Sequence, residues 1–306
     1  MGDANRILSV TEMSTFLQCR HKWALTSPSK EALQAKGFPA LPLILGTLTH
    51  AGLSAHALHQ DWGTAVQDAA GEYIASAQHE SDEDRIEQAV QEACAWICDY
   101  IDEYGDEPFS PLRVIASEQT FTLGIHEPFT GEMLGTLVGT FDYILTDSNN
   151  RLYIADTKTY SPQNRPSHEK YALDLQFNTY AWVAQQIFGR CDGVLYDGIE
   201  KKHPAKFERF MLRPDAAVLG NIAEQVRHIF REAFSEDFYP LRILGYECNR
   251  CPVRDLCFSG LAGEDTEWIE RQKYERNARG SRSRGAAGAA PATEIGNLQD
   301  FLDKTA

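Results

Sequence analysis

Two aspartates and a lysine stand at the end of a predicted β-hairpin, where charged side chains are unusual. A first strand ends near Leu145, the turn-forming residues TDSNN follow, and a second strand reads RLYIADTKTY. Side chains alternate along a strand, so Asp156 and Lys158 share a face, and Asp142 on the partner strand lies close enough to converge with them. Carboxylates suit Mg²⁺ or Mn²⁺, and such an ion with a nearby lysine suits phosphodiester hydrolysis. The hairpin alone is equally compatible with a solvated aspartate–lysine pair, because D-x-K is a common tripeptide.

Polar residues elsewhere in the chain extend this pattern. Gln176 and Tyr180 lie four residues apart in a helix expected over residues 168–188, so they share one face of that helix. His50 lies in a strongly helix-forming stretch upstream of the hairpin. Glu118 lies on a predicted strand; we expect a solvated edge-strand glutamate there, with an additional acidic residue of the site as the alternative.

The residues occur in a recognisable order. The chain reads G-x-x-x-H, G-x-x-D, D-x-K and Q-x-x-x-Y, carried by Gly46/His50, Gly139/Asp142, Asp156/Lys158 and Gln176/Tyr180. This order resembles the RecB-like branch of the PD-(D/E)XK nuclease superfamily, although Phe141 replaces the proline that usually precedes the first aspartate. The resemblance implies an α/β fold with a restriction-endonuclease-like core, in which helices flank a central mixed β-sheet.

The same resemblance implies a role for each matching residue. The catalytic residues would be Asp142, Asp156, Lys158, Gln176 and Tyr180. A divalent cation, Mg²⁺ or Mn²⁺, would be held by His50, Asp142, Asp156 and the main-chain carbonyl of Thr157. The imidazole ligand would shift the preference toward Mn²⁺, because it is a softer donor than a carboxylate.

The cysteines form a second pattern. Three of the seven stand as C-x2-C-x5-C at the far end of the chain, and one stands alone near the start. This grouping resembles the iron–sulfur staple of RecB-like exonucleases, including the CRISPR-adaptation exonuclease family, and implies a [4Fe-4S] cluster bound by Cys19, Cys248, Cys251 and Cys257. Zinc in the same four ligands remains the alternative. We expect the other three cysteines, Cys94, Cys98 and Cys191, to pack in the core.

The negative charge is concentrated in one stretch. The formal net charge is −15, and residues 55–110 hold fourteen Asp or Glu and one Arg. We expect this acidic helical insertion to face solvent, away from DNA, with a docking surface for a basic partner as the alternative.

The chain is expected to contain one large domain and a tail. Residues 1–265 would form the nuclease domain with its staple, joining the two ends of the chain. Residues 271–306 would be a disordered basic linker with a short amphipathic end, which could dock a recombination, replication or CRISPR-adaptation protein. No apolar run approaches the length of a membrane span, and no secretory signal is visible, so we expect a cytoplasmic protein of a bacterium or phage-infected cell.

The function that follows is a metal-dependent DNA exonuclease. By resemblance, its substrate would be single-stranded or end-opened DNA, in recombination, repair or CRISPR spacer processing. The alternatives are a catalytically silent DNA-end-binding subunit with a structural metal cluster, and a nuclease stapled by zinc. The chain carries no Walker A motif and hence no such helicase motor of its own.

Overall fold

The computed structural model describes residues 6–276, and these form two compact units. The first unit comprises residues 6–37, 122–138 and 223–276, and the second comprises residues 38–121 and 139–222. Strands β3 (Arg113–His126) and β4 (Met133–Thr146) and helix α8 (Ala216–Ala233) pass from one unit into the other.

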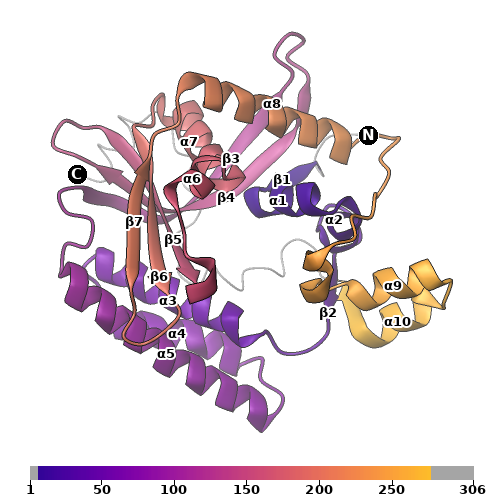
Figure 1. Cartoon of the computed structure of the whole chain (residues 1–306), viewed down its shortest axis with the longest axis horizontal. Helices are drawn as coiled ribbons and strands as arrows, with labels where there is room; N and C mark the ends of the chain where they lie inside the picture. Colours follow the sequence, from indigo (N-terminus) through magenta and orange to yellow (C-terminus); the bar gives the residue numbers. More distant parts are fainter. Residues whose placement is uncertain (1–5, 277–306) are drawn as a thin grey trace. The chain divides into compact units, whose positions relative to one another are not determined.

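The second unit is built on a mixed sheet (Figure 1). Besides β3 and β4, its strands are β5 (Leu152–Tyr160), β6 (Gly193–Glu200) and β7 (Phe207–Leu212). The strand order is β3–β4–β5–β6–β7, and only the β5–β6 pair is parallel among the pairs β4–β5, β5–β6 and β6–β7. The β4–β5 hairpin is the expected one, and the Asp147 carboxylate closes its turn by accepting hydrogen bonds from the N–H groups of Asn149 and Arg151.

Helices cover both faces of this sheet. Helices α3 (Leu41–Ala57), α4 (Trp62–Ile74) and α5 (Glu80–Tyr104) run side by side (Figure 1), and their apolar core includes Ile199 of β6. Tyr196, on the opposite face of β6, contacts Phe177 of α7 (Leu175–Phe188). The expected α/β class, with helices flanking a central mixed sheet, is therefore confirmed.

The helix expected over residues 168–188 is instead two helices. The short helix α6 (His168–Ala172) ends before Leu173, and Asp174 then caps α7 by accepting hydrogen bonds from the N–H groups of Gln176 and Phe177. Aspartate is a preferred N-cap, so α7 starts at Leu175 and Gln176 lies in its first turn.

Helix α5 explains how the acidic stretch folds. Its apolar stripe, which includes Ile86, Trp96 and Tyr100, is buried, while most of the acidic residues in 55–110 are exposed. Asp82 is an exception, because it is buried and accepts hydrogen bonds from the N–H groups of Gln78 and His79. The expectation that this stretch is largely solvated holds. In the described part of the chain, no helix is long and apolar enough to cross a membrane.

The first unit contains mainly short elements. They are β1 (Ile7–Ser9), α1 (Val10–Gln18), α2 (Arg20–Thr26), β2 (Leu33–Ala35), η2 (Tyr246–Arg250), α9 (Arg254–Ala262), α10 (Thr266–Lys273) and β8 (Tyr274–Arg276). Strand β1 pairs in parallel with the first part of β4, and β2 pairs antiparallel with β8. Cys19 separates α1 from α2, and Trp23 and Phe16 pack edge to face beneath them.

Helix α10 and strand β8 lie beyond the boundary expected at residue 265, so residues 271–276 are not the linker expected there. Helix α10 ends at Lys273, and Tyr274 in β8 is only 5% exposed, packed with Leu33, Val253 and Leu256. A segment with few apolar residues is ordered here because β2 supplies the strand partner and Leu33, while Val253 and Leu256 supply further apolar neighbours. The rest of the expected tail, residues 277–306, lies outside the described residues.

A truncation series tests this boundary. A chain ending at Arg276 keeps the β2–β8 ladder and the packing of Tyr274, whereas a chain ending at residue 270 loses both. We expect the shorter chain to lose about 3 kcal/mol or more of unfolding free energy, as for removal of a buried aromatic side chain. Urea unfolding of both truncations beside the full chain measures this, and equal stability of the two would refute a structural role for β8.

Candidate active site

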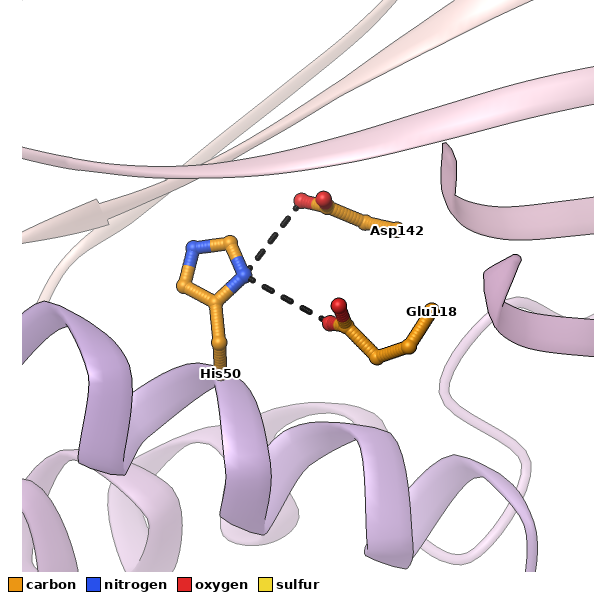
Figure 2. Close-up of side chains that lie close together, drawn as sticks. All are labelled: His50, Glu118 and Asp142. Atoms are coloured by element: carbon orange, nitrogen blue, oxygen red, sulfur yellow. Dashed lines mark ion pairs between the residues drawn. The ribbon is translucent and has the colours of Figure 1, made fainter. Parts of the chain in front are cut away.

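One histidine and two carboxylates meet in the second unit. His50 of α3 points toward Glu118 of β3 and Asp142 of β4 (Figure 2). The imidazole Nδ1 lies 3.4 Å from Asp142 Oδ2 and 4.0 Å from Glu118 Oε1, and the three ligand atoms all lie within 4.8 Å of one another. One nitrogen and two oxygens at this spacing can hold a divalent cation.

A hydrogen bond one helical turn after His50 holds helix α3 against strand β3. Ser54 shares the helix face with His50, and its hydroxyl lies 2.7 Å from that of Ser117, the residue before Glu118. This hydrogen bond ties the helix to the strand at the point where their ligand side chains meet. Gly46, one turn before His50, has open space where a side chain would stand.

Glu118 adopts an unusual backbone conformation for a residue inside a strand. Its φ is +48°, in the left-handed region that non-glycine residues rarely occupy. Such a conformation costs on the order of 1–3 kcal/mol and persists only where the surroundings enforce it. The expectation of an ordinary solvated edge-strand glutamate is therefore wrong: Glu118 is half-buried and turned toward His50.

Asp156 and Lys158 form the other half of the site. They share one face of β5, as predicted, and Lys158 Nζ lies 2.7 Å from Asp156 Oδ2. The other carboxylate oxygen of Asp156 accepts a hydrogen bond of 3.2 Å from Gln176 Nε2, which also contacts the Tyr180 hydroxyl at 3.0 Å. The structure thus brings Gln176 and Tyr180 of α7 together with Asp156 and Lys158 of β5.

Thr157 connects the two halves. Its N–H donates a 2.8 Å hydrogen bond to Asp142 Oδ2, the oxygen nearest His50. All the residues predicted for catalysis and metal binding therefore lie around one centre in the second unit. The role expected for the Thr157 carbonyl stays a prediction.

The carboxylates of this centre are too crowded to be fully ionised without further positive charge. Burial, reinforced by the charges of Asp142 and Asp156, raises the pKa of Glu118 to about 8. Burial also raises the pKa of Asp156 to about 7, with Asp142 adding to the effect and Lys158 opposing it. The negative charge here exceeds the positive charge of the neighbouring groups. A bound divalent cation would neutralise this excess.

Lys158 remains a cation in these surroundings. Burial by itself would lower the pKa of its ammonium group, but the carboxylates of Asp156 and Asp142 outweigh that effect and raise the pKa above its ordinary value. The side chain can therefore donate hydrogen bonds and offset charge, and it does not act as a neutral base.

The four cysteines of the predicted staple line one cavity in the first unit. The thiols of Cys19 and Cys248 accept hydrogen bonds of 3.5 Å from the N–H groups of Lys22 and Gly245. Burial raises the pKa of Cys251, and the neighbouring thiols of Cys19 and Cys257 add to this effect.

The same cavity is bordered by basic side chains, two of which have an unpartnered buried nitrogen. His21, Lys22, Arg242 and Arg254 contribute to its lining. His21 Nδ1 and Arg242 Nε are buried without a hydrogen-bond partner in the described part of the chain. Such groups are rare in folded proteins, and the Arg242 Nε–H favours an anionic occupant beside it. Four thiolates with their metal would meet this requirement.

The remaining cysteines follow the prediction only in part. Cys94 packs against the α3–α5 core, and Cys191 is half-buried with its thiol 3.4 Å from the Gly193 carbonyl. Cys98, expected in the core, is exposed on α5 because it lies off the apolar stripe of that helix.

Comparison with known proteins identifies the family. The sequence profile of the PD-(D/E)XK nuclease superfamily matches residues 7–258, so the chain belongs to this superfamily. No curated protein matches the chain. Among solved structures, a protein named SSO0001 is similar, with 13% identity and a TM-score of 0.40 over 84% of this chain and 87% of that one. Another is a protein of Eubacterium rectale described as a candidate exonuclease, with 12% identity and a TM-score of 0.47 over 80% of this chain and 88% of that one.

The family and the geometry agree on a nuclease with a divalent-metal site. PD-(D/E)XK nucleases use divalent metals, and a histidine–carboxylate cluster that can hold one is present here. Glu118 is the residue that sequence reasoning left aside, since the sequence does not reveal its backbone conformation.

The raised carboxyl pKa values predict how metal and pH act together. Between the ordinary carboxyl pKa and about 8, the folded protein binds more protons at Glu118 than the unfolded chain does, so without metal its stability falls as pH rises. Added Mg²⁺ should therefore raise the melting temperature more at about pH 8.5 than at about pH 6. Thermal unfolding with Mg²⁺ and with chelator measures this difference. In Asp142→Asn the difference should shrink, and an equal Mg²⁺ effect at both pH values in the wild type would contradict the prediction.

Proposed function

We propose that this protein is a metal-dependent DNA exonuclease of the RecB-like branch, acting on single-stranded or end-opened DNA. The observation that carries the proposal is the convergence of His50, Glu118 and Asp142 with the Asp156–Lys158 pair around one centre. These groups come from a helix and three strands, and the three carboxylates among them would repel one another unless a cation lay between them.

The residues have separate tasks in the proposed reaction. A bound Mg²⁺ or Mn²⁺ would polarise the scissile phosphate and acidify a water molecule. His50, Glu118 and Asp142 would hold that ion, together with Asp156 and the Thr157 carbonyl. The Lys158 ammonium group would orient the attacking water and offset the negative charge that develops on the phosphate.

Gln176 acts on Asp156, and Tyr180 contacts Gln176. The amide of Gln176 donates to one carboxylate oxygen of Asp156 while Lys158 contacts the other, so both oxygens are oriented. Burial, with the nearby carboxylates of Asp156 and Asp142, raises the pKa of Tyr180 well above its ordinary value, so its hydroxyl stays protonated.

The cysteine cavity is proposed to hold a [4Fe-4S] cluster. Support comes from the gathering of Cys19 with Cys248, Cys251 and Cys257, from N–H donors to two of the sulfur atoms, and from the basic lining with the unpartnered Arg242 Nε–H. Such a cluster would link the start of the chain to residues 248–257, and zinc in the same ligands is the rival.

The biological setting belongs to the same proposal. DNA with free ends or single strands would be the substrate in recombination, repair or CRISPR spacer processing in the cytoplasm of a bacterium or phage-infected cell. A recombination, replication or CRISPR-adaptation protein would bind through the tail. The silent end-binding alternative would not require the protonated Lys158 held against Asp156, and an activity assay separates the two.

Conservative variants test the nuclease proposal. Asp142→Asn, Asp156→Asn and Lys158→Ala should each lower Mn²⁺-dependent cleavage of labelled single-stranded DNA by about 100-fold or more, as for loss of a principal electrostatic group. Asp192→Asn is the matched control, since Asp192 accepts a hydrogen bond from the N–H of Leu152 at the other end of β5. It should retain cleavage, and full activity in either of the Asp142 and Asp156 variants would refute the assignment.

Metal analysis of anaerobically purified protein tests the cluster. Wild-type protein should be brown, with broad absorbance near about 400 nm, and Cys248→Ser and Cys251→Ser should lose both iron and colour. Cys191→Ser should keep them, because Cys191 lies outside the cavity. A colourless wild type with one zinc per chain would establish the zinc alternative, and iron loss in Cys191→Ser would show that the ligands are misassigned.

A further inference from the structure

A buried charged network lies in the second unit, on the face of β5 opposite Asp156 and Lys158. Asp197 of β6 is 0% exposed. Its Oδ1 accepts a 2.8 Å hydrogen bond from Arg209 Nε, and its Oδ2 accepts a 2.7 Å hydrogen bond from the hydroxyl of Tyr100 on α5. Arg209 also donates to the Tyr100 hydroxyl at 2.8 Å, so the three side chains form a closed triangle.

The guanidinium group of Arg209 is held on its other sides as well. It donates a 2.7 Å hydrogen bond to the carbonyl of Pro108 and lies 3.8 Å from the centre of the Tyr104 ring. The network therefore links the end of α5 and the segment after it to the centre of the sheet.

Stability alone does not account for such a network. Buried ion pairs often contribute no more than apolar residues of similar volume, because two charges must leave water. The surroundings here are apolar and aromatic, so the site could have been filled without charge. What the network adds is a fixed geometry, since a fully satisfied buried network has few alternative arrangements.

That geometry acts on the residue between Asp156 and Lys158. Thr157 is the register partner of Asp197 across the parallel β5–β6 pair, and its hydroxyl lies 3.5 Å from Asp197 Oδ2. Its side chain points to the face opposite Asp156 and Lys158, while its N–H holds Asp142 Oδ2 at 2.8 Å. Thr157 is thus in contact with the network through its hydroxyl and with a metal-site carboxylate through its main chain.

We propose that Asp197, Arg209 and Tyr100 are positioning residues for the metal site. They fix β5 at Thr157, so that the Thr157 N–H holds the Asp142 carboxylate in the orientation that binds the cation. This inference rests on the proposed nuclease function, because it assumes that Asp142 is a metal ligand.

The test is the affinity of the DNA-free full-length protein for Mn²⁺, measured by titration calorimetry or by the electron paramagnetic resonance signal of free Mn²⁺. Tyr100→Phe and Thr157→Val each remove one hydroxyl that contacts Asp197, with little change in the shape of the side chain. Each should weaken Mn²⁺ binding about 10-fold, which is the lower end of the effect of losing an outer hydrogen-bond partner of a metal ligand. Thr157→Ser keeps the hydroxyl and should bind Mn²⁺ within about twofold of the wild type.

Thr179→Val is the matched control. Thr179 is also fully buried in the second unit, and its hydroxyl has no hydrogen-bond partner within the described residues. This variant should leave the Mn²⁺ affinity unchanged. Melting temperatures of all variants separate a general loss of stability from a loss of metal affinity.

Three outcomes decide the question. Weakened Mn²⁺ binding in Tyr100→Phe and Thr157→Val, with recovery in Thr157→Ser, supports the proposal. Lower melting temperatures with wild-type Mn²⁺ affinity would show that the network only stabilises the fold, and would overturn it. A wild-type protein that does not bind Mn²⁺ or Mg²⁺ at all would overturn the nuclease proposal itself, a failure that is visible without any variant.

Discussion

The crowding of carboxylates around one half-buried centre is the constraint on which the second unit depends. Asp142 and Asp156 lie on neighbouring strands, Glu118 approaches from a third, and Lys158 is the cation in direct contact with Asp156. Burial and the neighbouring carboxylates raise the proton affinity of Glu118 and Asp156. A divalent cation would replace those protons, which would make metal binding and folding parts of one equilibrium.

The sheet supplies the rigidity that this crowding requires. Strands β5 and β6 are buried almost throughout, and their parallel pairing sets Thr157 opposite Asp197. On one face of β5, Asp156 and Lys158 meet the first turn of α7. On the other face, Thr157 meets α5 through the buried network. Strand β5 is therefore held on both faces, and its main chain connects the contacts on one face with those on the other.

Much of this arrangement could be predicted from the sequence because it follows from local rules. Strand alternation places Asp156 beside Lys158, helical spacing places Gln176 near Tyr180, and turn residues define the hairpin. The contribution of Glu118 could not be predicted in this way, because the sign of a φ angle at a non-glycine residue depends on tertiary surroundings. The ordering of Tyr274 was missed for a similar reason: its strand partner and its neighbour Leu33 come from β2, more than two hundred residues earlier in the chain. The contact of Tyr100 with Asp197 likewise joins residues far apart in the chain, although Asp197 and Arg209 are cross-strand partners on the consecutive strands β6 and β7.

The β2–β8 pairing has a consequence for the order in which the protein can fold during synthesis. Residues 38–222 include the whole second unit within the described chain, so its sheet and its ligand residues leave the ribosome first. The first unit needs both residues 33–35 and residues 274–276, and it cannot close until the last of these has emerged. Closing so long a loop carries an entropic cost, and the pairing of β8 with β2 must offset it together with the contacts of the cysteine segment, residues 248–257. A nascent chain therefore displays every residue of the proposed cation site before β2 and β8 can pair.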